Sequence, residues 1–118
     1  NLLGGTMIQD RLVEILGAKF LCVDEGFGTN NPVDVVIRPE DVELVKPEVG
    51  IIKGRVTSVI FKGVHYEMTV LANNFEWLVH STDMYPPDSE VGIFVKPFNI
   101  QIMHKPESED EKAVDINE

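Results

Sequence analysis

The fold is decided by residues 66–81, which read YEMTVLANNFEWLVHS. Asn73 and Asn74 both tolerate the positive φ that a two-residue type I′ turn requires, so this stretch predicts a tight β-hairpin. A turn at this point fixes the register, because successive side chains of a strand alternate between its two faces. One face then pairs Val70 with Trp77 and is apolar along its whole length. We predict that this face belongs to the core.

The opposite face of the hairpin carries residues that could support chemistry. On the same register Glu67 lies opposite His80, and His65 shares their face. Two imidazoles and one carboxylate could hold a metal ion. A cross-strand ion pair on a half-exposed face explains the same residues more simply. We therefore predict a surface pair of Glu67 and His80, and no metal site.

Turn-forming residues divide the rest of the chain into short runs that are rich in β-branched and aromatic residues. Such spacing is typical of an all-β barrel or sandwich. The predicted strands are residues 33–38, 51–61, 64–72, 75–81, 90–96 and 100–104. Residues 8–16 leave two alternatives open, because their apolar spacing is helical and Gly17 would serve as a helix C-cap. Periodicity alone favours a short amphipathic helix there, and strands are the alternative.

Length and charge restrict the classes of function. A chain of 118 residues corresponds to one domain, and no apolar run approaches the ~20 residues of a membrane span. Its net charge of −10 repels phosphate backbones and anionic lipids, so we expect neither nucleic-acid binding nor direct membrane insertion. Half of that charge lies in residues 106–118, which we predict to be a disordered acidic tail. The chain starts at Asn1 rather than at Met, and we expect it to be part of a larger polypeptide.

No stretch of the sequence predicts catalysis. The glycines of residues 26–31 suggest a phosphate-binding loop, but Pro32 and a β-rich run follow where such a loop needs a helix. The sequence contains neither a Walker phosphate loop nor a G-x-S-x-G motif. Cys22 lies in an apolar run and is predicted to be a small buried residue rather than a nucleophile. Trp77, Phe75 and Tyr66 could stack on bases, but the basic groove that single-strand binding requires is missing. We expect no catalytic residue and no cofactor in this chain.

Three stretches carry a family resemblance. They are VVIRPEDV at residues 35–42, GRVTSVIFKG at residues 54–63 and VGIFVKP at residues 91–97. Up to about Lys105, the chain resembles the C-terminal regulatory region of ABC-importer ATP-binding subunits, the region that contains the TOBE domain. Residues 58–66 and 77–80 make it most similar to the spermidine/putrescine type.

The resemblance implies an all-β, OB-like (TOBE) small barrel over residues 1–105, and it favours strands at residues 8–16. It implies that residues 1–5 end the connection from an ATPase domain. The parent would bind ATP and Mg, act as a homodimer and partner membrane permease subunits at the cytoplasmic face of the cell membrane. This chain would be its non-catalytic regulatory and dimerisation domain. The alternative is a ligand-sensing barrel that binds polyamine or a small anion.

The same resemblance assigns a structural and interface role to four residues: Arg38, Pro39, Glu40 and Asp41. Physically, a proline ends a strand because it cannot donate a ladder hydrogen bond. Opposite charges beside it can clamp the bend that follows. We expect these residues to form a strand terminus first and an interface second.

Overall fold

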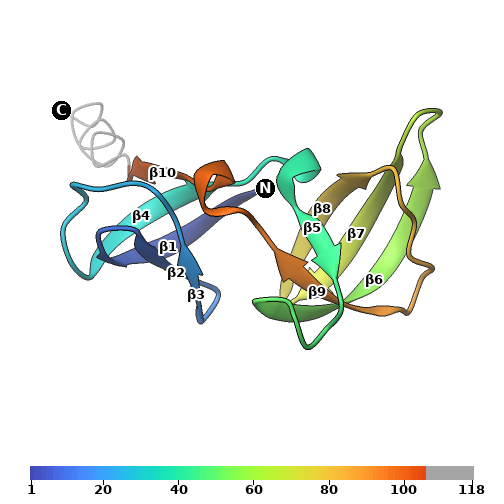
Figure 1. Ribbon diagram of the computed structural model, residues 1–118, viewed down its shortest axis with the longest axis horizontal. Helices are drawn as coiled ribbons and strands as arrows, with labels where there is room; N and C mark the ends of the chain where they lie inside the picture. Colours follow the sequence, from blue (N-terminus) through green and yellow to red (C-terminus); the bar gives the residue numbers. More distant parts are fainter. Residues whose placement is uncertain (106–118) are drawn as a thin grey trace, which may run out of the picture.

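The computed structural model describes residues 1–105, which form ten β-strands and two short 3-10 turns (Figure 1). The strands build two five-stranded antiparallel sheets. The first sheet has the order β10 (Gln101–His104), β4 (Asn31–Val36), β1 (Leu2–Gln9), β2 (Leu12–Ile15), β3 (Ala18–Leu21). The second has the order β5 (Glu43–Val45), β9 (Glu90–Phe94), β6 (Ile52–Phe61), β7 (Tyr66–Ala72), β8 (Phe75–Ser81). The predicted all-β class is confirmed, and the tail predicted at 106–118 lies outside the described residues.

The hairpin predicted at residues 66–81 is confirmed, including its register. Strands β7 and β8 pair Val70 with Trp77 and Glu67 with His80. Asn73 and Asn74 have φ values of 51° and 63°, as a type I′ turn requires. The apolar face is buried in the core, whereas Leu71 on the opposite face is exposed.

Residues 8–16 form strands and not a helix. Strand β1 continues to Gln9, the chain turns at Asp10 and Arg11, and β2 begins at Leu12. Val13 and Ile15 of β2 are two residues apart and both are buried in the core. The period of two of a strand therefore buries these apolar residues as well as a helix would. Strand pairing over these residues therefore overrides a helical spacing that had no long apolar face to bury.

The two sheets are copies of one another, a duplication that the sequence analysis did not detect. Their strand orders correspond position by position, with β1 to β4 equivalent to β6 to β9. The registers correspond as well: Leu3 pairs with Val35 in the first sheet, and Ile52 pairs with Ile93 in the second. The turn after β2 also has two positive φ values, 53° at Leu16 and 81° at Gly17. It is the equivalent of the Asn73 to Asn74 turn.

The fifth strand of each repeat is exchanged. After β4 the chain crosses to the second sheet, where β5 pairs with β9, and after β9 it crosses back so that β10 pairs with β4. Figure 1 shows these two crossings between the sheets. Strand β5 was missed in the sequence because it has only three residues. Because each sheet contains a strand from the other repeat, neither sheet is completed by one continuous repeat.

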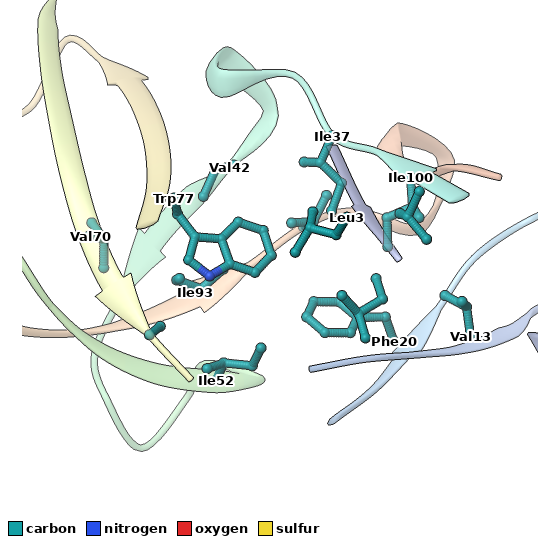
Figure 2. Close-up of a cluster of buried hydrophobic side chains, with 14 of the residues drawn as sticks. Leu3, Val13, Phe20, Ile37, Val42, Ile52, Val70, Trp77, Ile93 and Ile100 are labelled. Atoms are coloured by element: carbon teal, nitrogen blue, oxygen red, sulfur yellow. The ribbon is translucent and has the colours of Figure 1, made fainter. Parts of the chain in front are cut away.

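A continuous apolar core joins the sheets (Figure 2). Phe20 from β3 and Trp77 from β8 occupy equivalent positions after their turns, and both are fully buried. Figure 2 shows the two rings in one cluster, with side chains from both repeats around them. Asn73 Nδ2 also donates to Leu16 O at 2.8 Å, so the two turns contact each other directly. The core thus lies around the junction of the repeats.

Among residues 1–105 no helix has the length and apolar character needed to cross a membrane. The only helical segments there are the two 3-10 turns of the crossings. The division between a domain at 1–105 and a tail at 106–118 stays a prediction.

Candidate functional site: the crossings between the sheets

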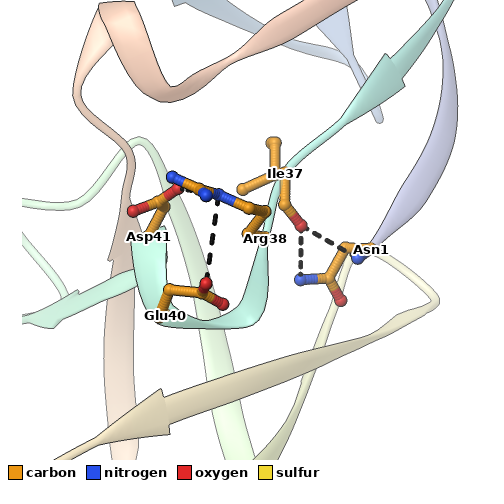
Figure 3. A network of polar contacts seen from close by, with 5 residues as sticks. All are labelled: Asn1, Ile37, Arg38, Glu40 and Asp41. Atoms are coloured by element: carbon orange, nitrogen blue, oxygen red, sulfur yellow. Dashed lines mark hydrogen bonds and ion pairs between the residues drawn. The ribbon is translucent and has the colours of Figure 1, made fainter.

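The residues singled out at 38–41 lie where the chain first crosses between the sheets. Arg38 is extended (φ −71°, ψ 146°) and precedes the 3-10 turn η1 (Pro39–Asp41). Its Nε donates to Asp41 Oδ2 at 2.9 Å and lies 4.0 Å from Glu40 Oε2 (Figure 3). The Asp41 N–H donates to Arg38 O at 2.9 Å. The bend is therefore clamped, and Asp41, rather than Glu40, is the main partner of Arg38.

The electrostatics of this bend keep Arg38 charged. The pKa of Arg38 is raised, first by its hydrogen bond to Asp41 and then by the charges of Asp41 and Glu40. The Arg38 side chain is 58% exposed, so solvent screens these charges and the ion pairs add little stability. The contact between Arg38 and Asp41 therefore sets the shape of the bend and contributes little to the stability of the fold.

The return crossing repeats this geometry without the acidic side chains. Lys96 is extended (φ −63°, ψ 140°) and precedes η2 (Pro97–Asn99). The Asn99 N–H donates to Lys96 O at 2.9 Å, as in the first crossing. Lys96 Nζ has a partner in β5, the strand that follows the first crossing, where Glu43 Oε2 lies at 3.8 Å. The first crossing is thus the acidic one.

An open cavity of about 370 Å³ lies between the first crossing and the end of β8. It brings together Glu40 and His80, two of the residues predicted from the sequence. Carboxylates dominate its wall, so it suits a cationic or hydrogen-bonding partner rather than an anion. Its lining residues are Glu40, Val42, Glu43, Leu44, His80, Ser81, Thr82 and Asp83.

The cavity wall offers no nucleophile with a base. Ser81 Oγ accepts a hydrogen bond from the Asp83 N–H at 3.0 Å, which makes it a turn residue. Acyl transfer needs a hydroxyl activated by a hydrogen-bonded base, and no hydrogen bond between Ser81 and His80 is present. The arrangement can bind but gives no support for catalysis.

Glu67 and His80 lie opposite each other on the surface of the second sheet. Glu67 Oε1 is 3.4 Å from His80 Nε2, and both side chains are 29% exposed. This contact does not meet hydrogen-bond geometry, and the buried Nε2 has no hydrogen-bond partner among the described residues. The His65 ring packs against the His80 ring with centroids 4.7 Å apart and the ring planes tilted by 37°. Within residues 1–105, no group of three or more His, Cys, Asp or Glu residues could hold a metal ion, and the absence of a metal stays a prediction.

The structure also bears on two other features considered in the sequence, the glycine-containing residues 26–31 and Cys22. Residues 26–31 lie at the end of the connection from β3 and include the first residue of β4, so a strand follows where a phosphate-binding loop needs a helix. Cys22 is a buried free thiol, as predicted. Burial raises its pKa, a backbone hydrogen bond from Asp24 lowers it, and the charge of Asp24 raises it again.

Sequence reasoning missed the second crossing and the role of Asn1. The signal for the crossing was present: residues 37–42 read IRPEDV and residues 95–100 read VKPFNI, a repeat of apolar, basic, proline and Asp or Asn positions. Asn1 gave no signal, because its contacts depend on residues 36 and 77 positions away.

Comparison with known proteins identifies the family. The TOBE domain family matches residues 35–97, or 63 of the 118 residues, from the end of β4 through the start of η2. The chain belongs to the TOBE domain family. The match contains the whole first crossing and the beginning of the return crossing, so the family signature spans most of the junction between the two repeats.

The curated relatives of this TOBE domain are longer proteins. It is 52% identical over 109 residues to the "Spermidine/putrescine import ATP-binding protein PotA" of Acetivibrio thermocellus, covering 92% of this chain and 31% of the relative. It is 55% identical over 106 residues to the protein of the same name from Bacteroides thetaiotaomicron, covering 89% of this chain and 23% of the relative. The chain therefore spans about a quarter to a third of the length of these relatives.

A solved structure shares the fold. The cytoplasmic molybdate-binding protein ModG, in a form with molybdate bound, superposes with a TM-score of 0.75 at 18% identity. The similarity covers 89% of this chain and 96% of the ModG chain. It confirms the OB-like TOBE fold, and at this identity it concerns the fold alone.

Proposed function

We propose that this TOBE domain is a non-catalytic regulatory and dimerisation domain of the ATP-binding subunit of a spermidine/putrescine importer. The observation that carries the proposal is the 52% identity, over 92% of this chain, to a spermidine/putrescine import ATP-binding protein. ATP and Mg would be bound by residues of the parent outside this chain. The loop at 26–31, which leads into a strand, supports this division of labour.

The partners follow from the same proposal. The parent would associate with membrane permease subunits at the cytoplasmic face of the cell membrane, and this domain would contact a second copy. Self-association is supported by the outer strands of the sheets, β10 and β3 in the first and β5 and β8 in the second, of which β8 is partly covered because Asn1 bonds both main-chain groups of Leu78. Unpaired edges are ready to pair with another chain.

A chimera tests the regulatory role. The matching 109-residue segment of the Acetivibrio thermocellus relative is replaced by this chain, and a second version simply lacks the segment. We expect the chimera to hydrolyse ATP and to support polyamine uptake with its permease, the truncated version to lose normal control of uptake, and this chain alone to show no turnover. Turnover by this chain alone would contradict the proposal.

Calorimetry with spermidine separates this proposal from the ligand-sensing alternative. The acidic cavity beside Glu40 and Asp83 is the place where a polyamine would meet complementary charge. We expect no micromolar binding to the 118-residue chain. Micromolar heats that disappear at high salt would favour the sensor instead.

Light scattering tests dimerisation. In 0.15 M salt, charges more than ~8 Å apart are screened, so contacts between edges outweigh the charge of −10 on each chain. We expect the mass to rise with concentration toward the dimer. A monomer mass up to about 1 mM would show that the edges do not pair.

A further inference from the structure

The side chain of Asn1 forms hydrogen bonds that link the two repeats. Its Nδ2 donates to Ile37 O at 3.1 Å (Figure 3). The same Nδ2 donates to Leu78 O at 3.0 Å, and the Oδ1 accepts from the Leu78 N–H at 2.7 Å. One primary carboxamide thus fills the gap between the free edge of β8 and the end of β4. All its hydrogen-bonding groups are satisfied by main-chain atoms.

The duplication defines the equivalent place in the other half. Leu78 is five residues after Asn73, as Leu21 is five residues after Leu16. Ile37 follows Val35 by two residues, as Val95 follows the equivalent Ile93. Leu21 and Val95 are therefore the counterparts of Leu78 and Ile37.

Leu21 and Val95 line an open cavity, whereas the equivalent place beside Leu78 and Ile37 is filled by the side chain of Asn1. The cavity measures about 290 Å³, and all of its lining but one residue is apolar: Lys19, Leu21, Ile51, Phe94, Val95 and Pro97. Leu21 is 65% exposed and is the last residue of β3. Strand β3 is an edge strand of the first sheet (Figure 1). In the position of Lys19 the other repeat has Glu76, so the two places differ in the charge at their rim.

Main-chain groups at this cavity lack the partner that Asn1 gives to their counterparts. The Cys22 N–H donates to Arg11 O across the β2 side, so the peptide groups of Leu21, one residue earlier, point to the free edge. No backbone hydrogen bond of Val95 is present among the described residues. The cavity therefore presents the same donor and acceptors that Asn1 satisfies on the other side.

The residue that corresponds to Asn1 cannot fill this cavity. By register it is Gly50, whose N–H donates to Lys46 O at 3.2 Å in a local turn. A Cβ on Gly50 would lie 2.5 Å from Gly92 Cα, so no side chain fits there. The chain's own sequence thus leaves the second carboxamide position open.

We propose that this cavity is a docking site for the side chain of Asn or Gln, carried on an extended apolar segment of a partner polypeptide. The carboxamide would accept from the Leu21 N–H and donate to the carbonyl oxygens of Leu21 and Val95. Neighbouring apolar side chains would cover Phe94 and Pro97, and an acidic residue would lie beside Lys19. This inference is independent of the proposed importer function, because it rests on the repeat geometry alone.

Amide hydrogen exchange on the 118-residue chain tests the site. The probe is the peptide acetyl-Asn-Leu-Leu-Glu-amide, and the control peptide has Leu in place of Asn. At saturating probe, exchange of the Leu21 N–H should slow at least about tenfold, while that of Leu78, already held by Asn1, stays unchanged. Equal protection by the control peptide, or protection of β5 or β10 with Leu21 unaffected, would overturn the proposal.

Two variants separate the contacts. Leu21→Pro removes the outward N–H without removing a ladder hydrogen bond, and it should abolish probe binding. Lys19→Glu, at an exposed position, should weaken the probe about threefold and strengthen the version with Lys in place of Glu by a similar factor. If Leu21→Pro fails to fold, the exchange measurement and Lys19→Glu still decide. Protection of Leu21 that grows with protein concentration without peptide would identify a second copy as the occupant and overturn the peptide assignment.

Discussion

The two repeats share one backbone plan and fill it with different side chains. The first has Phe20 at the junction, the second Trp77, and both are fully buried. The first begins with Asn1, whose side chain is hydrogen-bonded to Leu78 of β8. The second begins with Gly50, which has no side chain, and the equivalent place is an open cavity. The comparison shows that strand order and turns are set by features common to both halves, whereas binding surfaces arise where the halves differ.

The largest expected effect concerns the junction. Trp77→Ala should destabilise the domain by about 3–5 kcal/mol, since it removes a fully buried ring from the core shared by both repeats. Trp77→Phe, which gives the second repeat the residue of the first, should cost less than half as much. Its indole Nε1 has no hydrogen-bond partner, so no bond is lost. Urea unfolding followed by circular dichroism measures both variants.

The control for this pair is Val64→Ala. Val64 is 82% exposed, so its truncation should leave the unfolding midpoint nearly unchanged. A Trp77→Phe variant as unstable as Trp77→Ala would show that the two junction positions are not equivalent.

The second prediction tests the close contact of Gly92 with the main chain of Lys46 and Gly50, which has no equivalent in the first repeat. A Cβ on Gly92 would lie 2.5 Å from Lys46 O and 2.8 Å from Gly50 Cα, both main-chain atoms. Gly92→Ala should therefore cost about 1–3 kcal/mol of stability. The equivalent residue of the first repeat is Asp34, which holds only a partly exposed ion pair with Lys105. Asp34→Ala should cost less than about 1 kcal/mol, and equal losses at the two positions would contradict the proposed asymmetry.

The third prediction concerns the hydrogen bonds of the Asn1 side chain. Asn1→Leu deletes three partly buried hydrogen bonds and leaves Leu78 and Ile37 as exposed as their counterparts at the cavity. We expect a loss of about 1–3 kcal/mol and faster exchange of the Leu78 N–H. Asn1→Gln, which keeps the carboxamide, should recover part of the loss. Unchanged exchange at Leu78 would mean that Asn1 does not hold this edge.

How far the sequence predicts this structure depends on the range of each interaction. The hairpin at 66–81 is predicted to the residue, because a two-residue turn and an alternating pattern are local. The ambiguity at 8–16 could not be resolved locally, since Val13 and Ile15 are buried in a core cluster that includes residues much later in the chain. Family resemblance supplied the missing information in that case.

The exchanged strands and the cavity could not be predicted in the same way. Strand β5 is too short to have a pattern, and its partner β9 lies nearly fifty residues away. The repeated IRPEDV and VKPFNI segments were visible, but their meaning depends on the crossing that each one makes. Among the candidate residues, Arg38 and Asp41 were found because their pair is local; Asn1 and Val95 act through long-range contacts.

The smallest expected effect is a pH dependence at Cys22, whose equivalent in the second repeat is Val79. Burial raises the pKa of the Cys22 thiol above its ordinary value of 9.0. At a pH above that value the unfolded thiol loses its proton while the folded one keeps it, so the unfolded state binds fewer protons and stability falls as pH rises. Below it, Cys22 adds no pH dependence. Cys22→Val copies the second repeat and removes this titration without removing the packing. Urea unfolding at pH 7.5 and pH 9.5 should therefore show a larger loss for the wild type than for Cys22→Val. Parallel losses would mean that the thiol ionises as easily in the folded chain as in the unfolded one.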